Sequence, residues 1–158
     1  MDTTLADLTA EARGSTLPFD AARLDALLDA AGIDVLVVTS KHNVQYLFGG
    51  YRFFFFDHFD AIGLSRYLPV LVYVRGRPAD AAYLGNPMEG YEEALGKFWT
   101  PRFEKVWGSV GAITAAAEHI RRLGKAGARI GVGRPFLPAD AEEALRKALP
   151  DAKILDAG

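Results

Sequence analysis

The sequence contains no cysteine among its 158 residues, which excludes disulfide bonds, thiolate metal sites and cysteine nucleophiles together. It also lacks an apolar run of about 18 residues, the length that a membrane-spanning helix requires. Its first residues have neither the basic start nor the apolar centre of a secretion signal. We therefore expect a soluble, cytoplasmic protein with no membrane partner.

Charge of one sign is also missing, because 18 basic and 20 acidic residues leave a formal net charge of -2. The longest basic cluster is Arg121-Arg122, which is too short to follow a phosphate backbone. These features argue against a nucleic-acid partner. Half of the residues are apolar, and the length suits one folded domain with a single core.

Side chains that bind metals are few and scattered. The three histidines, His42, His58 and His119, lie far apart in the sequence. Only the run 57–60, Asp-His-Phe-Asp, brings ligand-type side chains together, and such a run more often forms the polar end of an apolar element. We predict no metal-ligating residue in this chain.

Two further patterns give little support for a dinucleotide-binding turn or a serine nucleophile. Residues 131–133, Gly-Val-Gly, resemble the start of a dinucleotide-binding turn, but Phe136 replaces the third glycine, which favours a tight strand exit. Ser40, Ser65 and Ser109 have no nucleophile-elbow setting. We predict no catalytic residue, so a small independent enzyme is the least favoured interpretation.

Strands and helices are expected to alternate, with one hairpin around Gly76. Expected helices cover residues 20–31, 41–48, 88–95, 109–123 and 138–149, with Asp20, Ser40 and Ser109 as N-caps. Expected strands cover residues 33–38, 51–58, 69–74, 81–84, 103–107, 129–132 and 152–155. This order predicts a three-layer α/β domain with a mixed sheet over residues 18–158, preceded by an arm at residues 1–17.

The most unusual passage is the aromatic segment, residues 51–58, which contains four consecutive phenylalanines. Such a composition favours an extended strand. One face would carry Arg52, Phe54, Phe56 and His58, and the other Tyr51, Phe53, Phe55 and Asp57. The segment is either plain core or has one face free as an interface or pocket wall.

Asn43 and Tyr46 lie three residues apart on the short helix before this segment, which ends at Gly49-Gly50. One interpretation is structural: Asn43 bonds to backbone, while Tyr46 buries its ring and hydrogen-bonds its hydroxyl. The other is that both side chains serve a site. Asn43 and Tyr46 are most simply explained by the structural interpretation.

This passage resembles the N-terminal domain of the creatinase, prolidase and Xaa-Pro aminopeptidase family. Residues Asp34, Asn43, Tyr46 and Gly49 match that family's motif in order and spacing, whereas Phe48 and the extra Gly50 depart from it. The resemblance implies a ribonuclease-H-like three-layer α/β/α fold with a mixed, five- to six-stranded sheet. It gives Asp34, Asn43, Tyr46 and Gly49 the role of a structural motif.

The resemblance also implies that residues 18–158 are a non-catalytic domain. In the family's peptidases, a following "pita-bread" domain holds two divalent metal ions, and this chain ends where that domain would begin. The expected role is homodimerisation and shaping of the pocket for a small peptide or amide substrate. The implied substrate-proximal or interface residues are Tyr51, Arg52, Phe54, Phe56 and His58. A stand-alone binding or assembly module without enzymatic activity is the alternative.

Overall fold

The computed structural model describes residues 16–158, so the predicted arm lies almost wholly outside the described residues. The helices are α2 (Ala21–Ala30), α3 (Lys41–Leu47), α4 (Phe55–His58), α5 (Gly90–Ala94), α6 (Ser109–Arg122) and α7 (Ala139–Ala148). Short 3-10 turns are η1 (Pro78–Asp80), η2 (Pro87–Glu89) and η3 (Arg134–Phe136). The strands are β1 (Val35–Val38), β2 (Val70–Val74), β3 (Ala82–Gly85), β4 (Arg102–Lys105), β5 (Arg129–Val132) and β6 (Lys153–Asp156). Over this range, no helix combines the length and apolar character needed to cross a bilayer.

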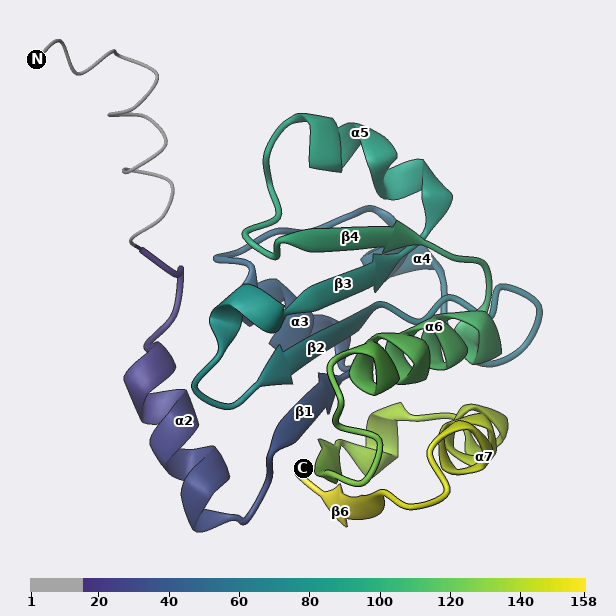
Figure 1. Ribbon diagram of the computed structural model, residues 1–158. Coiled ribbons are helices and arrows are strands. Elements are labelled where there is room, and N and C mark those ends of the chain that lie inside the picture. The colour runs from purple at the N-terminus through teal and green to yellow at the C-terminus, as the bar shows by residue number, and fades with distance from the viewer. Residues whose placement is uncertain (1–15) are drawn as a thin grey trace, which may run out of the picture.

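The six strands form one mixed sheet in the order β4-β3-β2-β1-β5-β6 (Figure 1). Strand β2 runs antiparallel to both of its neighbours, and the other pairs are parallel. The expected hairpin is therefore confirmed as β2–β3, turning through Gly76 at φ +71° and η1. The chain builds outward from β1 to β4 and then crosses back to place β5 and β6 on the other side of β1.

Helices cover both faces of the sheet, which confirms the three-layer α/β architecture (Figure 1). Helices α6 and α7 pack on one face, while α2, α3 and the aromatic segment pack on the other. The side chains of β2 alternate between the hydrophobic clusters on the two faces of the sheet. Val70, Val72 and Val74 pack in the cluster under α6 and α7, whereas Leu71 and Tyr73 pack in the cluster under α2 and α3. All five β2 residues are buried, as expected for a central strand.

The expectation of an extended aromatic segment is wrong, because α4 occupies its second half. The segment packs on the face of the sheet that α2 and α3 cover, and it pairs with none of the six strands. Helical turns satisfy its backbone locally, and Phe55 and Phe59, one turn apart, bring their ring centroids to 4.3 Å. The predicted alternation of buried and exposed side chains holds from Tyr51 to Phe55 and fails from Phe56 onward, within α4.

Of the three predicted N-caps, Asp20 and Ser40 form and Ser109 does not. Asp20 accepts a hydrogen bond from the Arg23 amide at 2.9 Å and caps α2 as predicted. Ser109 does not cap α6: Gly108 takes that position at φ +73°, and Ser109 is the first, fully buried helical residue.

Candidate functional site

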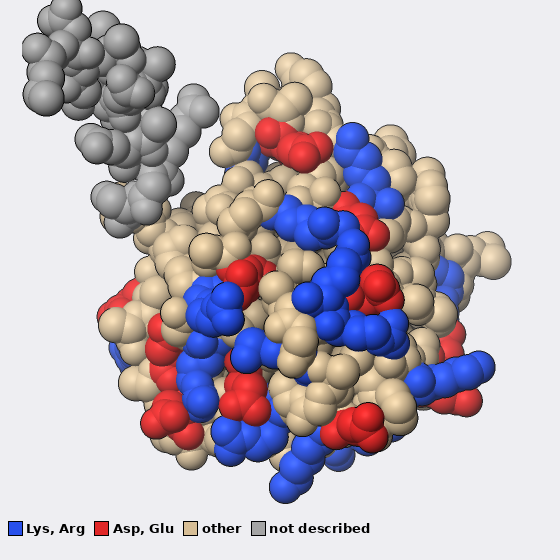
Figure 2. Space-filling model, in the orientation of Figure 1, with Lys and Arg blue, Asp and Glu red and all other residues tan. Residues whose placement is uncertain are grey.

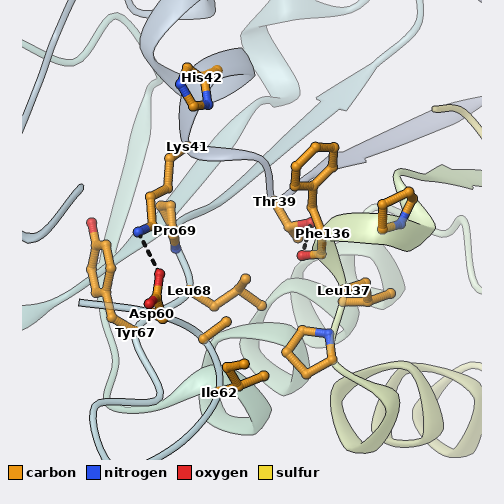
Figure 3. Close-up of a pocket in the computed structure, with 13 residues that line it drawn as sticks. Thr39, Lys41, His42, Asp60, Ile62, Tyr67, Leu68, Pro69, Phe136 and Leu137 are labelled. Atoms are coloured by element: carbon orange, nitrogen blue, oxygen red, sulfur yellow. Dashed lines mark hydrogen bonds and ion pairs between the residues drawn. The ribbon is translucent and has the colours of Figure 1, made fainter. Parts of the chain in front are cut away.

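A pocket of about 580 Å³ opens at the carboxyl edge of the sheet, where β1 and β5 end and β2 begins (Figure 3). Its lining residues come from three separate loops and the start of α3: Thr39, Lys41, His42, Asp60, Ala61, Ile62, Tyr67, Leu68, Pro69, Pro135, Phe136, Leu137 and Pro138. Strands β1 and β5 are parallel neighbours, and the chain leaves β1 toward α3 on one face of the sheet and leaves β5 toward α7 on the other. Such a switch point is where open α/β sheets form ligand crevices.

The pocket wall is mostly aliphatic and proline-rich, and its polar groups near the strand ends are already paired. Thr39 Oγ1 donates to the Phe136 carbonyl at 2.8 Å, which ties the β1 exit to η3. Leu68 and Leu137 are buried below the opening, whereas Ile62 is 68% exposed at its edge (Figure 3). This surface is suited to an apolar group and not to a charged one.

Lys41 connects the pocket to the aromatic segment. Its Nζ donates to the carbonyls of Phe56 and Phe59, at 3.0 and 2.5 Å, and pairs with the Asp60 carboxylate at 3.0 Å. Both carbonyls lie at the end of α4, where backbone acceptors lack helical partners and a positive charge is favoured. The lysine therefore acts as the C-terminal cap of α4.

The five site residues implied by the resemblance divide into two groups. Tyr51 and Phe56 are each 7% exposed and belong to the core. Arg52, Phe54 and His58 reach the surface, with Phe54 49% exposed. Only the second group is available to a substrate or another subunit.

The Arg52 guanidinium is already engaged within the chain. It pairs with Asp57 through two nitrogens, the Nε–Oδ2 distance being 3.1 Å, and its Nη1 donates to Gln45 Oε1 at 3.4 Å. The hydrogen bond from Arg52 lowers the pKa of Asp57. Binding an external carboxylate at Arg52 would require Asp57 to be displaced.

Asp34 lies at the opposite end of β1, away from the pocket. It accepts hydrogen bonds from the Arg129 amide at 2.9 Å and from Arg129 Nε and Nη2 at 3.0 and 2.8 Å. Arg75 adds a further contact at 3.3 Å. These bonds, led by the Arg129 side chain, lower the pKa of Asp34 to about 2. Asp34 joins the start of β1 to β5 and to the end of β2.

Asn43 and Tyr46 occupy the solvent side of α3, contrary to the expectation of a buried tyrosine. Tyr46 is 65% exposed. The backbone amide of Asn43 donates to Ser40 Oγ at 3.4 Å, so Ser40 is the N-cap of α3, as predicted. Both side chains line a shallow groove of about 200 Å³ that also includes Phe136 and Gly158.

Gly49 has the structural role expected of it. It follows α3 at φ +70°, its amide donates to the Tyr46 carbonyl at 3.0 Å, and the Gly50 amide donates to Gln45 at 2.9 Å. This pair of bonds is a Schellman motif. A Cβ at Gly49 would lie 2.8 Å from Cβ of Pro18.

Within residues 16–158, no three His, Asp or Glu side chains gather closely enough to hold a metal ion. In the run 57–60, both carboxylates already form ion pairs, Asp57 with Arg52 and Asp60 with Lys41. Residues 16–158 therefore offer no set of ligands for a metal ion. Figure 2 shows basic and acidic side chains interspersed over the face in view.

Residues 131–133 serve packing, as the strand-exit interpretation expects. A Cβ on Gly131 would lie 2.7 Å from Cδ1 of Ile33 and 3.1 Å from Cβ of Ala157. The glycine thus makes room for side chains that cross β5.

Two features escaped the sequence reasoning. The carboxyl-edge pocket joins residues separated by up to about a hundred positions, and no local pattern marks it. The second is Glu89, which is 0% exposed. Its signal was available: Asn86-Pro87-Met88-Glu89 has the spacing of a capping box, and the structure forms that box.

The comparisons with known proteins agree with this fold. A search of curated proteins finds no match. Among solved structures, the Xaa-Pro dipeptidase from Bacillus anthracis aligns with a TM-score of 0.59 and 19% identity, covering 87% of this chain and 32% of that protein. The N-terminal domain of cytoplasmic peptidase PepQ from Mycobacterium tuberculosis aligns with a TM-score of 0.62 and 16% identity, covering 87% and 92%. A proline dipeptidase from Streptococcus pneumoniae gives 0.62 and 15%, covering 87% and 90%.

These identities establish similarity of fold alone, and this chain spans about a third of the Bacillus anthracis dipeptidase. The family comparison goes further. The model of the "Creatinase/Prolidase N-terminal domain" matches residues 21–158, which include every described helix and strand. The chain therefore belongs to the creatinase/prolidase N-terminal domain family.

Proposed function

We propose that this chain is the non-catalytic N-terminal domain of a metal-dependent hydrolase of the Xaa-Pro aminopeptidase or dipeptidase kind, working in the cytoplasm. The observation that carries the proposal is the family match over residues 21–158. The two divalent metal ions would be held by a separate catalytic domain, which would supply the hydrolytic chemistry. This chain would mediate homodimerisation and shape the substrate pocket.

The exposed part of the aromatic segment supports the second role. Phe54, Arg52 and His58 stand on one short stretch beside the carboxyl-edge pocket, and Lys41 holds that stretch to the pocket wall. An apolar wall next to cationic and aromatic groups suits a small peptide or amide substrate with an apolar side chain. The aliphatic pocket adds room for such a side chain.

Dimerisation is tested by sedimentation velocity of the 158-residue chain over a concentration series. We expect self-association that Phe54→Ser weakens, because Phe54 is a large apolar side chain that is 49% exposed. Tyr91→Ser is the matched control, since Tyr91 is 71% exposed and belongs to α5, outside the aromatic segment. A chain that stays monomeric at millimolar concentration contradicts the dimerisation role.

The pocket-shaping role is tested in the longer protein that contains the catalytic domain. Arg52→Ala and His58→Ala should raise KM for a proline dipeptide or lower kcat. Unchanged KM and kcat in both variants would remove these residues from the substrate site. If the reading frame instead stops at Gly158, the chain is a stand-alone module.

A further inference from the structure

A carboxylate lies inside the aromatic core, and no lysine, arginine or histidine of residues 16–158 forms an ion pair with it. Glu89, in η2, is 0% exposed. Two lysines that follow Glu89 in the sequence pair with other carboxylates, Lys97 with Glu92 at 2.6 Å and Lys105 with Glu93 at 3.8 Å. Burying an unpaired carboxylate is unfavourable unless hydrogen bonds replace the lost water. Its presence in this core calls for a structural reason.

Three hydrogen bonds replace that water. Tyr83 and Tyr51 donate their hydroxyls to Glu89 Oε1, at 2.6 and 2.9 Å, and the Asn86 amide donates to Oε2 at 2.6 Å. Burial raises the pKa of Glu89, and these donors act in the opposite direction. A Cβ on Gly85 would lie 2.7 Å from Oε2, so the backbone leaves space for the carboxylate.

The three donors differ in what they connect. Tyr83 and Asn86 lie within six residues of Glu89, and Tyr83 is already fixed by pairing of β3 with its neighbours. Tyr51 lies 38 residues away, at the start of the aromatic segment. The Glu89–Tyr51 bond is therefore the long-range connection of this cluster.

The aromatic segment depends on such side-chain contacts, because it forms no ladder with any strand. Lys41 fixes its end through the Phe56 carbonyl, and Glu89 fixes its beginning through Tyr51. Between these two anchors lie Arg52 and Phe54, which face solvent.

We propose that Glu89 is the positioning residue of the aromatic segment, holding Tyr51 so that the following residues present Arg52, Phe54 and His58 in one fixed arrangement. The positioning is a property of this chain; only its consequence for a substrate or a second subunit rests on the proposed function. A residue that merely capped η2 would affect residues 86–90 and leave the segment unchanged.

Tyr51→Phe and Tyr83→Phe form a matched pair for the test. Each removes a hydroxyl that donates to the same oxygen of Glu89, and each keeps a ring that packs on Phe48 and Phe98. Amide hydrogen exchange of the 158-residue chain is measured by NMR or mass spectrometry, with core amides of β2 as the reference for global unfolding.

Tyr51→Phe should raise exchange in residues 52–58 by about tenfold relative to the reference, the effect expected for losing a hydrogen bond to a charged group. Tyr83→Phe should leave residues 52–58 at the wild-type rate, since Tyr51 still donates. Equal exchange in the two variants, or no change in Tyr51→Phe, overturns the proposal.

Glu89→Gln provides an independent variant should either phenylalanine variant fail to fold. The glutamine side chain has one acceptor oxygen where the glutamate has two. If that oxygen faces the tyrosines, the NH2 group faces the Asn86 N–H; if it faces the Asn86 N–H, the tyrosine hydroxyls lose their acceptor. The variant should therefore speed exchange in residues 52–58 and 86–90 together. Faster exchange at 86–90 alone assigns Glu89 to capping and overturns the proposal. Sedimentation of the wild-type chain reports separately on dimerisation: a monomeric wild type whose segment is loosened by Tyr51→Phe contradicts the proposed function and leaves the positioning role of Glu89 intact.

Discussion

Gly49 shows how one position can meet two constraints at once. Its φ of +70° disfavours any side chain, and a Cβ would meet Pro18 at 2.8 Å. Gly49→Ala should lower the free energy of unfolding by about 2 kcal/mol, measured by urea denaturation. Gly50→Ala is the control, because Gly50 has φ +101° and no atom within 4 Å of its Cβ position. Its loss should be about 1 kcal/mol, and equal losses would show that the Pro18 contact is relieved without cost.

Asp34 gives the stability a defined pH dependence. Its pKa falls from 3.8 to about 2 on folding, chiefly through Arg129, so the folded state favours the ionised form. That stabilisation is present above the unfolded pKa near 3.8 and is lost as the pH falls toward 2. Between about pH 5 and pH 2, the wild type should lose about 1–2 kcal/mol more unfolding free energy than Asp34→Asn.

Urea titrations at several pH values measure this difference. Asp29→Asn is the control, because Asp29 also pairs with Arg75 but its side chain is 78% exposed. Its pH profile should follow that of the wild type within about 0.5 kcal/mol. An Asp34→Asn profile parallel to the wild type would mean that Arg129 contributes nothing through this carboxylate.

Single residues also mark the limit of sequence reasoning. Gly49 could be predicted, since a glycine after an apolar helical stretch is a typical C-terminal cap. The exposure of Tyr46 could not. Helix α3 has seven residues, of which only Val44 and Leu47 are buried, so its inward face is too poorly defined by periodicity to place an amphipathic side chain.

At the scale of elements, the strand predicted for the aromatic segment is the instructive error. Consecutive phenylalanines have a high strand propensity, but that propensity reflects packing on a sheet surface as much as backbone preference. Here the rings pack onto one face of the sheet, and the backbone forms α4, whose terminal carbonyls accept hydrogen bonds from Lys41 Nζ. The lysine lies 15 residues upstream of Phe56, a separation at which no local rule connects them.

Lys41→Met should therefore loosen α4 while keeping most of the aliphatic packing. Two carbonyls and Asp60 would lose their shared donor, which should lower the unfolding free energy by about 1–2 kcal/mol in urea denaturation. Lys97→Met is the control: its ammonium pairs only with Glu92, and its side chain is 48% exposed. That variant should lose less than about 0.5 kcal/mol. Equal losses of unfolding free energy in the two variants would show that Lys41, as the cap of α4, contributes no more to stability than an ordinary surface ion pair.

At the scale of the whole molecule, periodicity identified the order of elements but not their neighbours. The strands expected near residues 33–38 and 129–132 are adjacent in space, although the sequence between them builds three further strands. That adjacency depends on α6 crossing the sheet, which local patterns do not encode. The carboxyl-edge pocket exists only because of this crossing, so it could not be predicted with the elements.

The two hydrophobic clusters lie on opposite faces of one sheet and share its strands, which should make them unfold together. Ile120, fully buried in α6, belongs to one cluster, while Trp99 packs against the other and donates Nε1–H to the Leu47 carbonyl at 2.7 Å. Ile120→Ala should lower the unfolding free energy by about 3 kcal/mol. In a Trp107→Phe background, Trp99 fluorescence and far-UV circular dichroism should shift to the same lower urea midpoint. A Trp99 transition that stays at the parental midpoint while the dichroism shifts would show that the two layers unfold independently.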